Sequence, residues 1–234
     1  MSEKTLAIVG HGRMGRAVEH LALESGWRIA AILDENWHTE NARSALNGAS
    51  VAVEFTAPDC APDNIRAIVQ AGCPIVVGTT GWYSQLNELA EFVQLVRGSM
   101  LWSPNFSVGA QILVSLARTA GELLRKASAF DAHLVETHHS AKKDKPSGTA
   151  IAIGAAAEST LGRSIPITSV RTGHEPGTHE LIFDAQFEQI RMVHRARDRR
   201  VFAAGALLAA DWLRARESGV YTMQDLLANT EEAT

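Results

Sequence analysis

The densest group of reactive side chains lies in residues 135–149, where two adjacent histidines and three lysines precede a Pro-Ser-Gly-Thr turn. Histidine titrates near neutral pH, so His138 or His139 could act as a general acid. Lys142 in the loop could hold a carboxylate or a ring nitrogen and offer a proton. Single histidines and lysines are usually surface residues, but five such groups before one turn indicate a site that handles protons and an anion.

The turn itself is suited to bind that anion. We expect a helix to begin near Ser147, which leaves the backbone N–H groups of Ser147, Gly148 and Thr149 free at its positive end. A carboxylate would fit there. Plain N-capping by Ser147 is the alternative, and it is compatible with ligand binding.

Two other features of the sequence could carry chemistry. The histidines could bind a metal, but no Glu or Cys falls at a familiar ligand spacing, so we expect no metal site. The cationic segment 194–200 has the pattern of a solvated strand face, although some of its arginines could neutralise a diacid.

A glycine motif near the N-terminus predicts a dinucleotide site. The sequence GHGRMG gives Gly10, Gly12 and Gly15 the G-x-G-x-x-G spacing, directly after the apolar run 5–9 and at the start of a helical pattern. In that context the glycines allow a tight turn, a close approach to pyrophosphate and close helix packing. An ordinary glycine turn is the alternative.

Asp34 favours NADH as the cofactor. It ends the predicted strand 27–33, about 20 residues after the glycines, where a carboxylate can accept hydrogen bonds from a ribose. It would repel a ribose 2′-phosphate, and Glu35 and Asn36 add no cation. Two alternatives stay open: Arg13 or Arg16 could still reach a phosphate, and Asp34 could be a solvated strand-end residue.

The elements that must position these motifs alternate in the first half of the chain. Strands followed by helices at this spacing predict an α/β fold with a Rossmann-type, doubly wound parallel sheet. Gly78, Thr79 and Thr80 end the fourth strand, where open sheets bind ligands. The strands are expected at 5–9, 27–33, 51–55, 74–80 and 100–103, and the helices at 13–25, 65–72 and 84–97.

The second half predicts an α+β substrate domain with a mainly antiparallel sheet. We expect helices over 107–126, from Ser147 and over 207–228, and strands at 130–138, 165–172, 179–187, 190–195 and 200–204. The pattern change places a hinge near Asn105 and Phe106. The expected domains are 1–105, completed by 206–234, for the dinucleotide, and 106–205 for substrate binding and catalysis.

Composition excludes several classes of partner. The 234 residues carry a net charge of −4 with a pI of about 6.1, so the overall field does not favour nucleic acid or an anionic membrane. No apolar stretch approaches the roughly 20 residues that span a bilayer. Two cysteines and a start unlike a signal peptide predict a cytoplasmic protein with reduced thiols and small-molecule ligands.

Together these motifs resemble one family, the 4-hydroxy-tetrahydrodipicolinate reductases, also called dihydrodipicolinate reductases, of lysine and diaminopimelate biosynthesis. The resemblance covers most of the chain and is carried by VEFTAPD, VVGTTGW, PNFSVG, HHSAKKDKPSGTA and RTGHEPGTHE. It implies NAD(P)H-dependent reduction of the cyclic imine dicarboxylate from 4-hydroxy-tetrahydrodipicolinate to tetrahydrodipicolinate, with closure between the two domains. The alternatives are another two-domain NAD(P)-dependent dehydrogenase and a non-catalytic nucleotide-sensing protein.

The resemblance also implies roles for individual residues. His138 would be the proton donor and Lys142 a second one, while Arg199 would be a further substrate contact. The substrate dicarboxylate would be bound by His139, Ser147, Gly148 and Thr149. The cofactor would be contacted by Gly10, His11, Gly12, Arg13, Met14, Gly15, Asp34, Gly78, Thr79, Thr80, Ser103, Pro104, Asn105 and Phe106.

The chain departs from the family pattern in three places. Its glycine loop is one residue shorter than in many relatives, which should still hold pyrophosphate. Asp34 is followed by Glu35 where many relatives have an arginine, which weakens the case for NADPH. After Thr178 a stretch common in the family is missing, which shortens the sheet through which relatives form tetramers. A homo-oligomer is therefore expected, with the tetramer left open.

Overall fold

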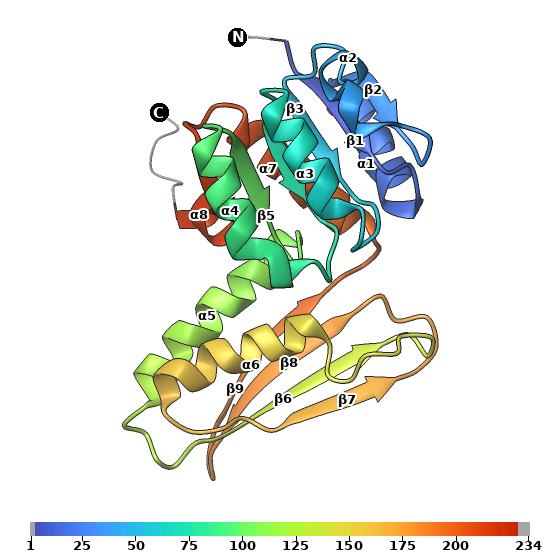
Figure 1. Cartoon of the computed structure of the whole chain (residues 1–234). Helices are drawn as coiled ribbons and strands as arrows, with labels where there is room; N and C mark the ends of the chain where they lie inside the picture. The colour runs from blue at the N-terminus through green and yellow to red at the C-terminus, as the bar shows by residue number, and fades with distance from the viewer. Residues whose placement is uncertain (1–2, 229–234) are drawn as a thin grey trace. The chain divides into compact units, whose positions relative to one another are not determined.

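The computed structural model describes residues 3–228 and divides into two compact units (Figure 1). The first unit is built from both ends of the chain, up to Phe106 and again from Phe202. The second unit is the intervening segment Ser107–Val201. No helix in the described part of the chain is both long and apolar enough to cross a membrane.

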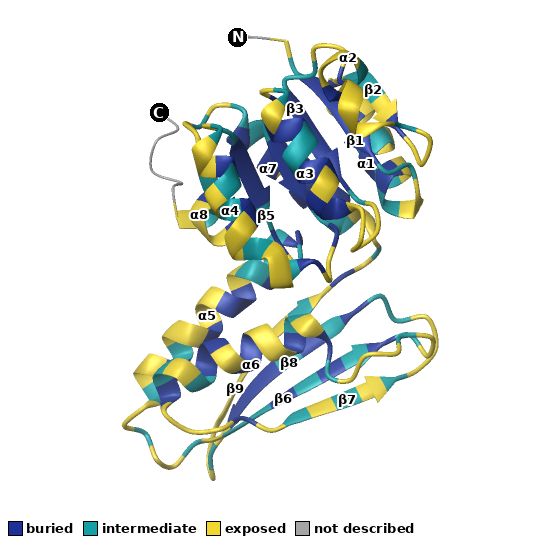
Figure 2. Cartoon of the chain, in the orientation of Figure 1, coloured by how far each residue is buried: buried dark blue, intermediate teal, exposed yellow. Residues whose placement is uncertain are grey.

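A six-stranded parallel sheet forms the centre of the first unit, with the strand order β10-β5-β4-β3-β1-β2. Its middle strands are buried along their whole length (Figure 2), which explains why they read as continuous apolar runs. The predicted doubly wound sheet is thus confirmed. The strands are β1 (Thr5–Val9), β2 (Arg28–Leu33), β3 (Val51–Glu54), β4 (Ile75–Val77), β5 (Ser99–Trp102) and β10 (Gly219–Thr222).

Helices connect the strands of the first unit. The order of the strands reverses between β1 and β3, and ligands of open α/β sheets bind at such a point. The helices are α1 (Arg13–Glu24), α2 (Ala42–Ala45), α3 (Ala61–Gln70), α4 (Leu86–Leu95), α7 (Arg200–Leu213) and α8 (Met223–Ala228), with short 3₁₀ turns at Thr39–Asn41 and Tyr83–Gln85.

The second unit has a four-stranded sheet in the order β7-β6-β8-β9. Two of its three strand pairs are antiparallel, and β6 and β7 run parallel, so the sheet is mainly antiparallel as predicted. Two helices pack their apolar sides on one face around Leu134, Leu181 and Phe183. The elements are α5 (Val108–Leu124), β6 (Asp131–His138), α6 (Gly148–Leu161), β7 (Ile167–Arg171), β8 (Thr178–Asp184) and β9 (Gln189–Arg195).

Two sequence-based predictions of elements are wrong, and one helix was not predicted. The strand expected at 200–204 is the first turn of α7, because a short apolar run cannot be told from a helix by periodicity and the Asp198 carboxylate accepts from the Arg200 N–H at 2.7 Å. The helix expected over 207–228 ends at Leu213, and Gly219–Thr222 pairs with β5 as a sixth strand. The polar stretch before β3 contains the short helix α2, which was not predicted.

Candidate functional site

The carboxyl ends of β1, β2 and β3 surround a cavity of about 780 Å³ in the first unit. Of the residues predicted for the cofactor, Gly10, His11, Gly12 and Asp34 line it. Asp34 directly follows β2, and its side chain accepts a hydrogen bond from the Asn36 N–H at 2.9 Å. The rest of the lining is Arg16, Glu35, Trp37, Thr39, Phe55, Thr56, Ala57, Asp59, Cys60, Asp63 and Asn64.

The three motif glycines have different environments. Gly10 has φ +90°, and a Cβ there would lie 2.2 Å from the Phe55 carbonyl oxygen. A Cβ at Gly15 would lie 2.0 Å from the Gly10 carbonyl oxygen, so this glycine lets α1 pack against β1. A Cβ at Gly12 would meet nothing within 4 Å. Gly10 and Gly15 therefore allow the chain to fold, whereas Gly12 leaves room beside the free N–H groups of α1.

The turn after β4 is fixed by a buried carboxyl group. Glu54 is fully buried at the end of β3, and its Oε1 accepts from the Thr79 hydroxyl at 2.9 Å and from the Thr56 N–H at 3.1 Å. Burial raises the pKa of Glu54, and the hydrogen bonds from Thr56 and Thr79 oppose that shift. A Cβ at Gly78 would lie 2.0 Å from the Phe55 ring. Thr79 is thus a buried support of this turn, and Thr80 is exposed.

The segment after β5 lies outside the cavity lining. The Ser103 hydroxyl donates to the Asn105 carbonyl oxygen at 2.8 Å, while Pro104 is exposed. Phe106 is buried and packs edge-on against Phe55, with ring centroids 6.2 Å apart. Like these residues, Arg13, Met14, Gly15 and the Gly78–Thr80 turn are not among the cavity-lining residues.

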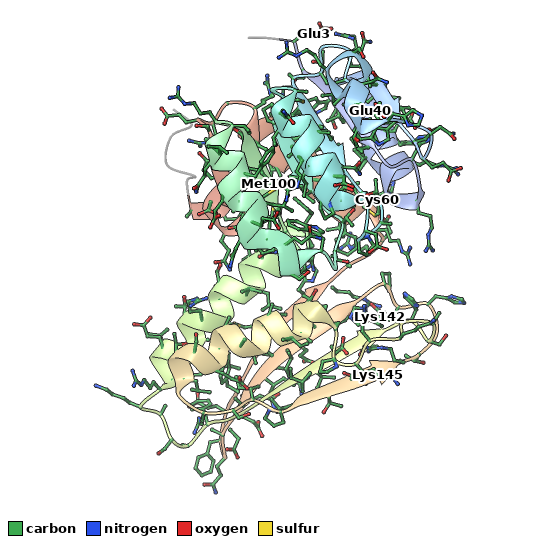
Figure 3. The ribbon with its side chains drawn as sticks, viewed as in Figure 1. Glu3, Glu40, Cys60, Met100, Lys142 and Lys145 are labelled. Atoms are coloured by element: carbon green, nitrogen blue, oxygen red, sulfur yellow. The ribbon has the colours of Figure 1, made fainter. Side chains whose placement is uncertain are left out.

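In the second unit, the strand β6 and the helix α6 bring several predicted residues together. His138 is the last residue of β6 and is buried, and His139 follows it half-buried. Lys142 and Lys145 lie on the loop between β6 and α6 (Figure 3), where the Lys142 ammonium pairs with Asp144 at 2.8 Å.

Ser147 is the N-cap of α6. Its hydroxyl accepts from the Ala150 N–H at 3.2 Å, and Gly148 and Thr149 form the first turn. The N-capping that the sequence left open is therefore present. It satisfies one of the N–H groups at the helix start, where the positive end of the helix dipole favours an anion.

A carboxylate that sequence reasoning missed lies beside His138. Glu136 is fully buried, its Oε2 is 3.0 Å from His138 Nε2, and its Oε1 accepts from Arg171 Nη2 at 2.6 Å and from the Ser147 N–H at 3.3 Å. Burial alone would raise the pKa of Glu136, but hydrogen bonds from Ser169, Ser147 and Arg171 lower it to about 2. Glu136 is therefore a carboxylate near neutral pH.

Two further histidines join this group from neighbouring strands. Glu136, His179 and His194 are directly opposite one another in β6, β8 and β9. His179 contacts the Ser147 hydroxyl at 3.2 Å, and His194 contacts the Ser107 hydroxyl at 3.1 Å. Burial and the charge of His138 lower the pKa of His179 to about 4, and burial lowers that of His194.

The histidine pKa values determine the charge of the site. Burial lowers the pKa of His138, while the nearby Glu136 carboxylate opposes that shift. His179 is neutral near pH 7 because its pKa is so low. The alternation of each strand could have shown that His179 faces inward, but the strand register that aligns it with Glu136 is not visible in one sequence.

The group also has the composition of a metal site. One ligand atom each from Glu136, His138 and His179 can be chosen so that all lie within 4.8 Å of one another. The Arg171 guanidinium, 2.6 Å from the same carboxylate, already supplies the positive charge there. A divalent cation would meet this charge at close range, so the arrangement is better explained as an ion pair with hydrogen bonds. Arg199, the remaining predicted contact, is exposed before α7.

Two family models match the chain. The model described as dihydrodipicolinate reductase, N-terminus, matches residues 4–106, and the model described as dihydrodipicolinate reductase, C-terminus, matches residues 109–227. Together they span both structural units.

Curated relatives agree with these models. The 4-hydroxy-tetrahydrodipicolinate reductase of Stenotrophomonas maltophilia is 36% identical, with 97% of this chain and 100% of the relative covered. The enzyme of the same name from Thiobacillus denitrificans is 34% identical, with 95% and 97% covered.

Solved structures share the fold. Dihydrodipicolinate reductase from Paenisporosarcina sp. TG-14, bound to dipicolinate, superposes with a TM-score of 0.79 at 19% identity and covers 94% of this chain and 98% of that one. An amine dehydrogenase from Mycobacterium smegmatis gives a TM-score of 0.63 at 10% identity, with 94% of each chain covered.

Proposed function

The chain belongs to the dihydrodipicolinate reductase family, and from that premise we propose that it reduces the cyclic imine dicarboxylate derived from 4-hydroxy-tetrahydrodipicolinate to tetrahydrodipicolinate. This reaction belongs to lysine and diaminopimelate biosynthesis. The observation that supports it most directly is the joining of His138, Lys142 and the Ser147–Thr149 turn at one end of β6 and α6. A non-catalytic sensor would have no need of that cluster.

NAD(P)H fits the cavity of the first unit. The turn needs glycine at positions 10 and 15 for its own packing, and Gly12 leaves the space beside α1 open. We propose that this backbone holds the pyrophosphate, with His11, Arg13 and Met14 around it. The remaining cofactor contacts are proposed at Asp34, Gly78, Thr79, Thr80, Ser103, Pro104, Asn105 and Phe106. When bound, the reduced nicotinamide supplies the hydride.

The substrate dicarboxylate is proposed to bind at the start of α6. The positive end of the helix dipole beside Gly148 and Thr149 suits one carboxylate, and Ser147 fixes the turn as its N-cap. His139 follows β6 directly and is proposed as a second substrate contact. Lys142 adds a positive charge on the loop between them, although Asp144 holds it in this structure. Substrate binding would therefore compete with Asp144 for the ammonium group.

The proposed chemistry of this chain is the delivery of protons. The reduced ring carbon or nitrogen needs a proton, and His138 is proposed to donate it, with Lys142 as a second donor. Burial keeps water away from His138, and the backbone turn keeps the carboxylate in a fixed place. Together they orient the substrate for protonation.

The test is a coupled assay with the aldol product of pyruvate and aspartate semialdehyde, run with each cofactor. His138→Gln and Lys142→Ala are each expected to lower turnover by about 10²–10⁴-fold, the usual contribution of a positioned acid. Lys143→Ala, an exposed neighbour, serves as the control. The proposal fails if both variants keep turnover within about threefold of the parent.

We further propose that NADH is preferred over NADPH. The exposed Asp34 carboxylate lines the cavity beside Glu35 and would repel a 2′-phosphate. Asp34→Ala is expected to raise the KM for NADH by about tenfold, because the ribose loses a hydrogen bond to a charged group. The KM for NADPH should stay equal or fall, because the negative charge that repels the 2′-phosphate is gone. Arg16 also lines the cavity, so an initial preference for NADPH, lost in Arg16→Ala, would overturn this proposal.

We propose that copies associate through the face of the second unit's sheet that α5 and α6 leave uncovered. Val135 alternates with the buried residues of β6, and Val170 and Val193 alternate with half-buried residues of β7 and β9, which puts all three on that outer face. Val170 and Val193 are exposed in the single chain. Association would bury these side chains.

The compartment that we propose is the cytoplasm. Cys60 and Cys73 are both unpaired thiols in the structure. Free cysteines are common in reducing compartments, and the biosynthetic function suits the same place.

A further inference from the structure

An ionised side chain occupies a place on β6 that the strand pattern would give to an apolar residue. Leu134, Glu136 and His138 are the buried residues of β6 and share the face that packs on the helices. Their neighbours on this face include Leu181 and Phe183. An unpaired carboxylate there would cost several kcal/mol, so its retention requires strong compensating contacts.

The two carboxylate oxygens of Glu136 contact different groups. Its Oε1 accepts from Arg171 at 2.6 Å and from the backbone N–H of Ser147 at 3.3 Å, which ties it to the turn proposed to bind substrate. Its Oε2 faces His138 Nε2 at 3.0 Å and has no hydrogen-bond partner within the described residues. One side chain thus reaches both the turn and the proposed acid.

The surroundings of the His138 ring fit its protonated form. The ring hydrogen-bonds the backbone of Pro176, whose only polar group is a carbonyl acceptor, while Nε2 faces the Glu136 carboxylate. A neutral imidazole has one N–H, so a ring that donates to Pro176 would turn a lone pair towards the carboxylate. An imidazolium instead places positive charge there, which the carboxylate stabilises at 3.0 Å although the two atoms form no aligned hydrogen bond in this structure.

Other charges near His138 act against that protonated form. They are Arg171 on β7 and Lys142 on the loop, which lower the pKa of His138, while His179 on β8 packs its neutral ring against that of His138. Burial lowers the pKa of His138 further. Glu136 is the charged group that favours the proton, and the hydrogen bond to the Pro176 backbone adds to its effect.

We propose that Glu136 is a positioning residue for the reaction, which holds His138 in its proton-donating form and fixes it relative to the Ser147 turn. This inference rests on the proposed function, in which His138 is the acid. Glu136 does not touch the reacting atoms. It acts through His138 and through the backbone of Ser147.

Two substitutions with opposite expected effects test the proposal. Glu136→Gln removes the negative charge, so the high-pH limb of the kcat/KM profile should move to lower pH by about one unit, with about a tenfold loss of kcat/KM above that limb. Arg171→Gln removes a positive charge and should move the same limb to higher pH. Glu122→Gln is the matched control, because Glu122 is an exposed carboxylate on α5 of the same unit.

A second readout does not depend on turnover. The ring ¹⁵N shifts of His138, in protein labelled at histidine, give its titration directly in the parent and in both variants. The expected result is a lower His138 pKa in Glu136→Gln and a higher one in Arg171→Gln. If the titration shifts as expected but no variant or parent reduces the substrate, the positioning role stands and the proposed function fails.

The results that overturn the positioning role are equally definite. If Glu136 has only a structural role, Glu136→Gln and Arg171→Gln should both lower the melting temperature. The high-pH limb of the kcat/KM profile and the His138 titration should then stay as in the parent. If Glu136→Gln does not fold, the test rests on Arg171→Gln. In that variant, a high-pH limb of the kcat/KM profile that stays in place or moves to lower pH contradicts the proposal.

Discussion

At the scale of single residues, we expect Gly10 to be needed for folding and Gly12 for cofactor binding. Gly10→Ala should destabilise the protein by about 1–3 kcal/mol, because its φ of +90° is strained for alanine and its Cβ would lie 2.2 Å from the Phe55 carbonyl oxygen. Gly12→Ala should leave the free energy of unfolding within about 1 kcal/mol of the parent. It should instead weaken NADH binding at least about tenfold, because the new methyl enters the space proposed for pyrophosphate.

Urea unfolding and calorimetric titration with NADH distinguish the two glycine variants. The opposite pattern, a stable Gly10→Ala protein or a Gly12→Ala protein with full affinity, would mean that the pyrophosphate is held elsewhere.

Glu54 gives a prediction about stability and pH. Burial raises its pKa in the folded protein, so the folded state binds more protons than the unfolded one between the two pKa values. The stability of the parent is therefore complete below the unfolded pKa and falls as pH rises through the folded pKa. Glu54→Gln should lose this dependence, so its free energy of unfolding relative to the parent should rise between pH 4 and pH 8, as measured in urea.

The control for that experiment is Glu91→Gln, because Glu91 is exposed on α4. It should follow the pH dependence of the parent. Parallel curves for Glu54→Gln and the parent would show that the pKa of Glu54 is the same in the folded and unfolded protein, which would contradict the raised pKa.

Some residues of the candidate site could be predicted from the sequence and others could not. Gly10, Gly12 and Asp34 were predictable because one βαβ unit fixes their separation along the chain. Glu136, His179 and His194 were not, because they meet through the register of β6, β8 and β9. A single sequence gives the face of each side chain but not the strand that it pairs with.

At the scale of elements, α7 shows the same limit. Its first residues, RVFAA, are as apolar as a strand, and the helix was recognisable only from the longer run that follows. Gly205 lies in the middle of α7, and a Cβ there would lie 1.7 Å from the Phe106 carbonyl oxygen. This glycine lets α7 pack directly on the chain after β5.

A matched pair of substitutions in α7 tests that packing. Alanine is a better helix former than glycine by about 1 kcal/mol, yet Gly205→Ala should destabilise the protein because the methyl group meets backbone. The neighbouring Ala204 is exposed, and Ala204→Gly should cost about 1 kcal/mol from helix propensity alone. Thermal unfolding measures both. A stabilised Gly205→Ala protein would show that α7 can move away from Phe106.

At the scale of the whole molecule, the uncovered sheet face predicts the state of assembly. Sedimentation should give a mass that is a multiple of 25.2 kDa, and Val193→Asp should lower it, because a charge would be buried between copies. Leu95→Asp is the control, since Leu95 is 81% exposed on α4 in the other unit. A parent that sediments at 25.2 kDa would contradict association through this face.

The first unit takes its strands from both ends of the chain, with β10 pairing on β5. On the ribosome, β5 is therefore synthesised more than a hundred residues before its neighbour and presents an unpaired edge while the rest of the polypeptide emerges. Such an edge invites pairing with other nascent chains. Maturation of this protein should accordingly depend on chaperones that shield β5 until translation ends.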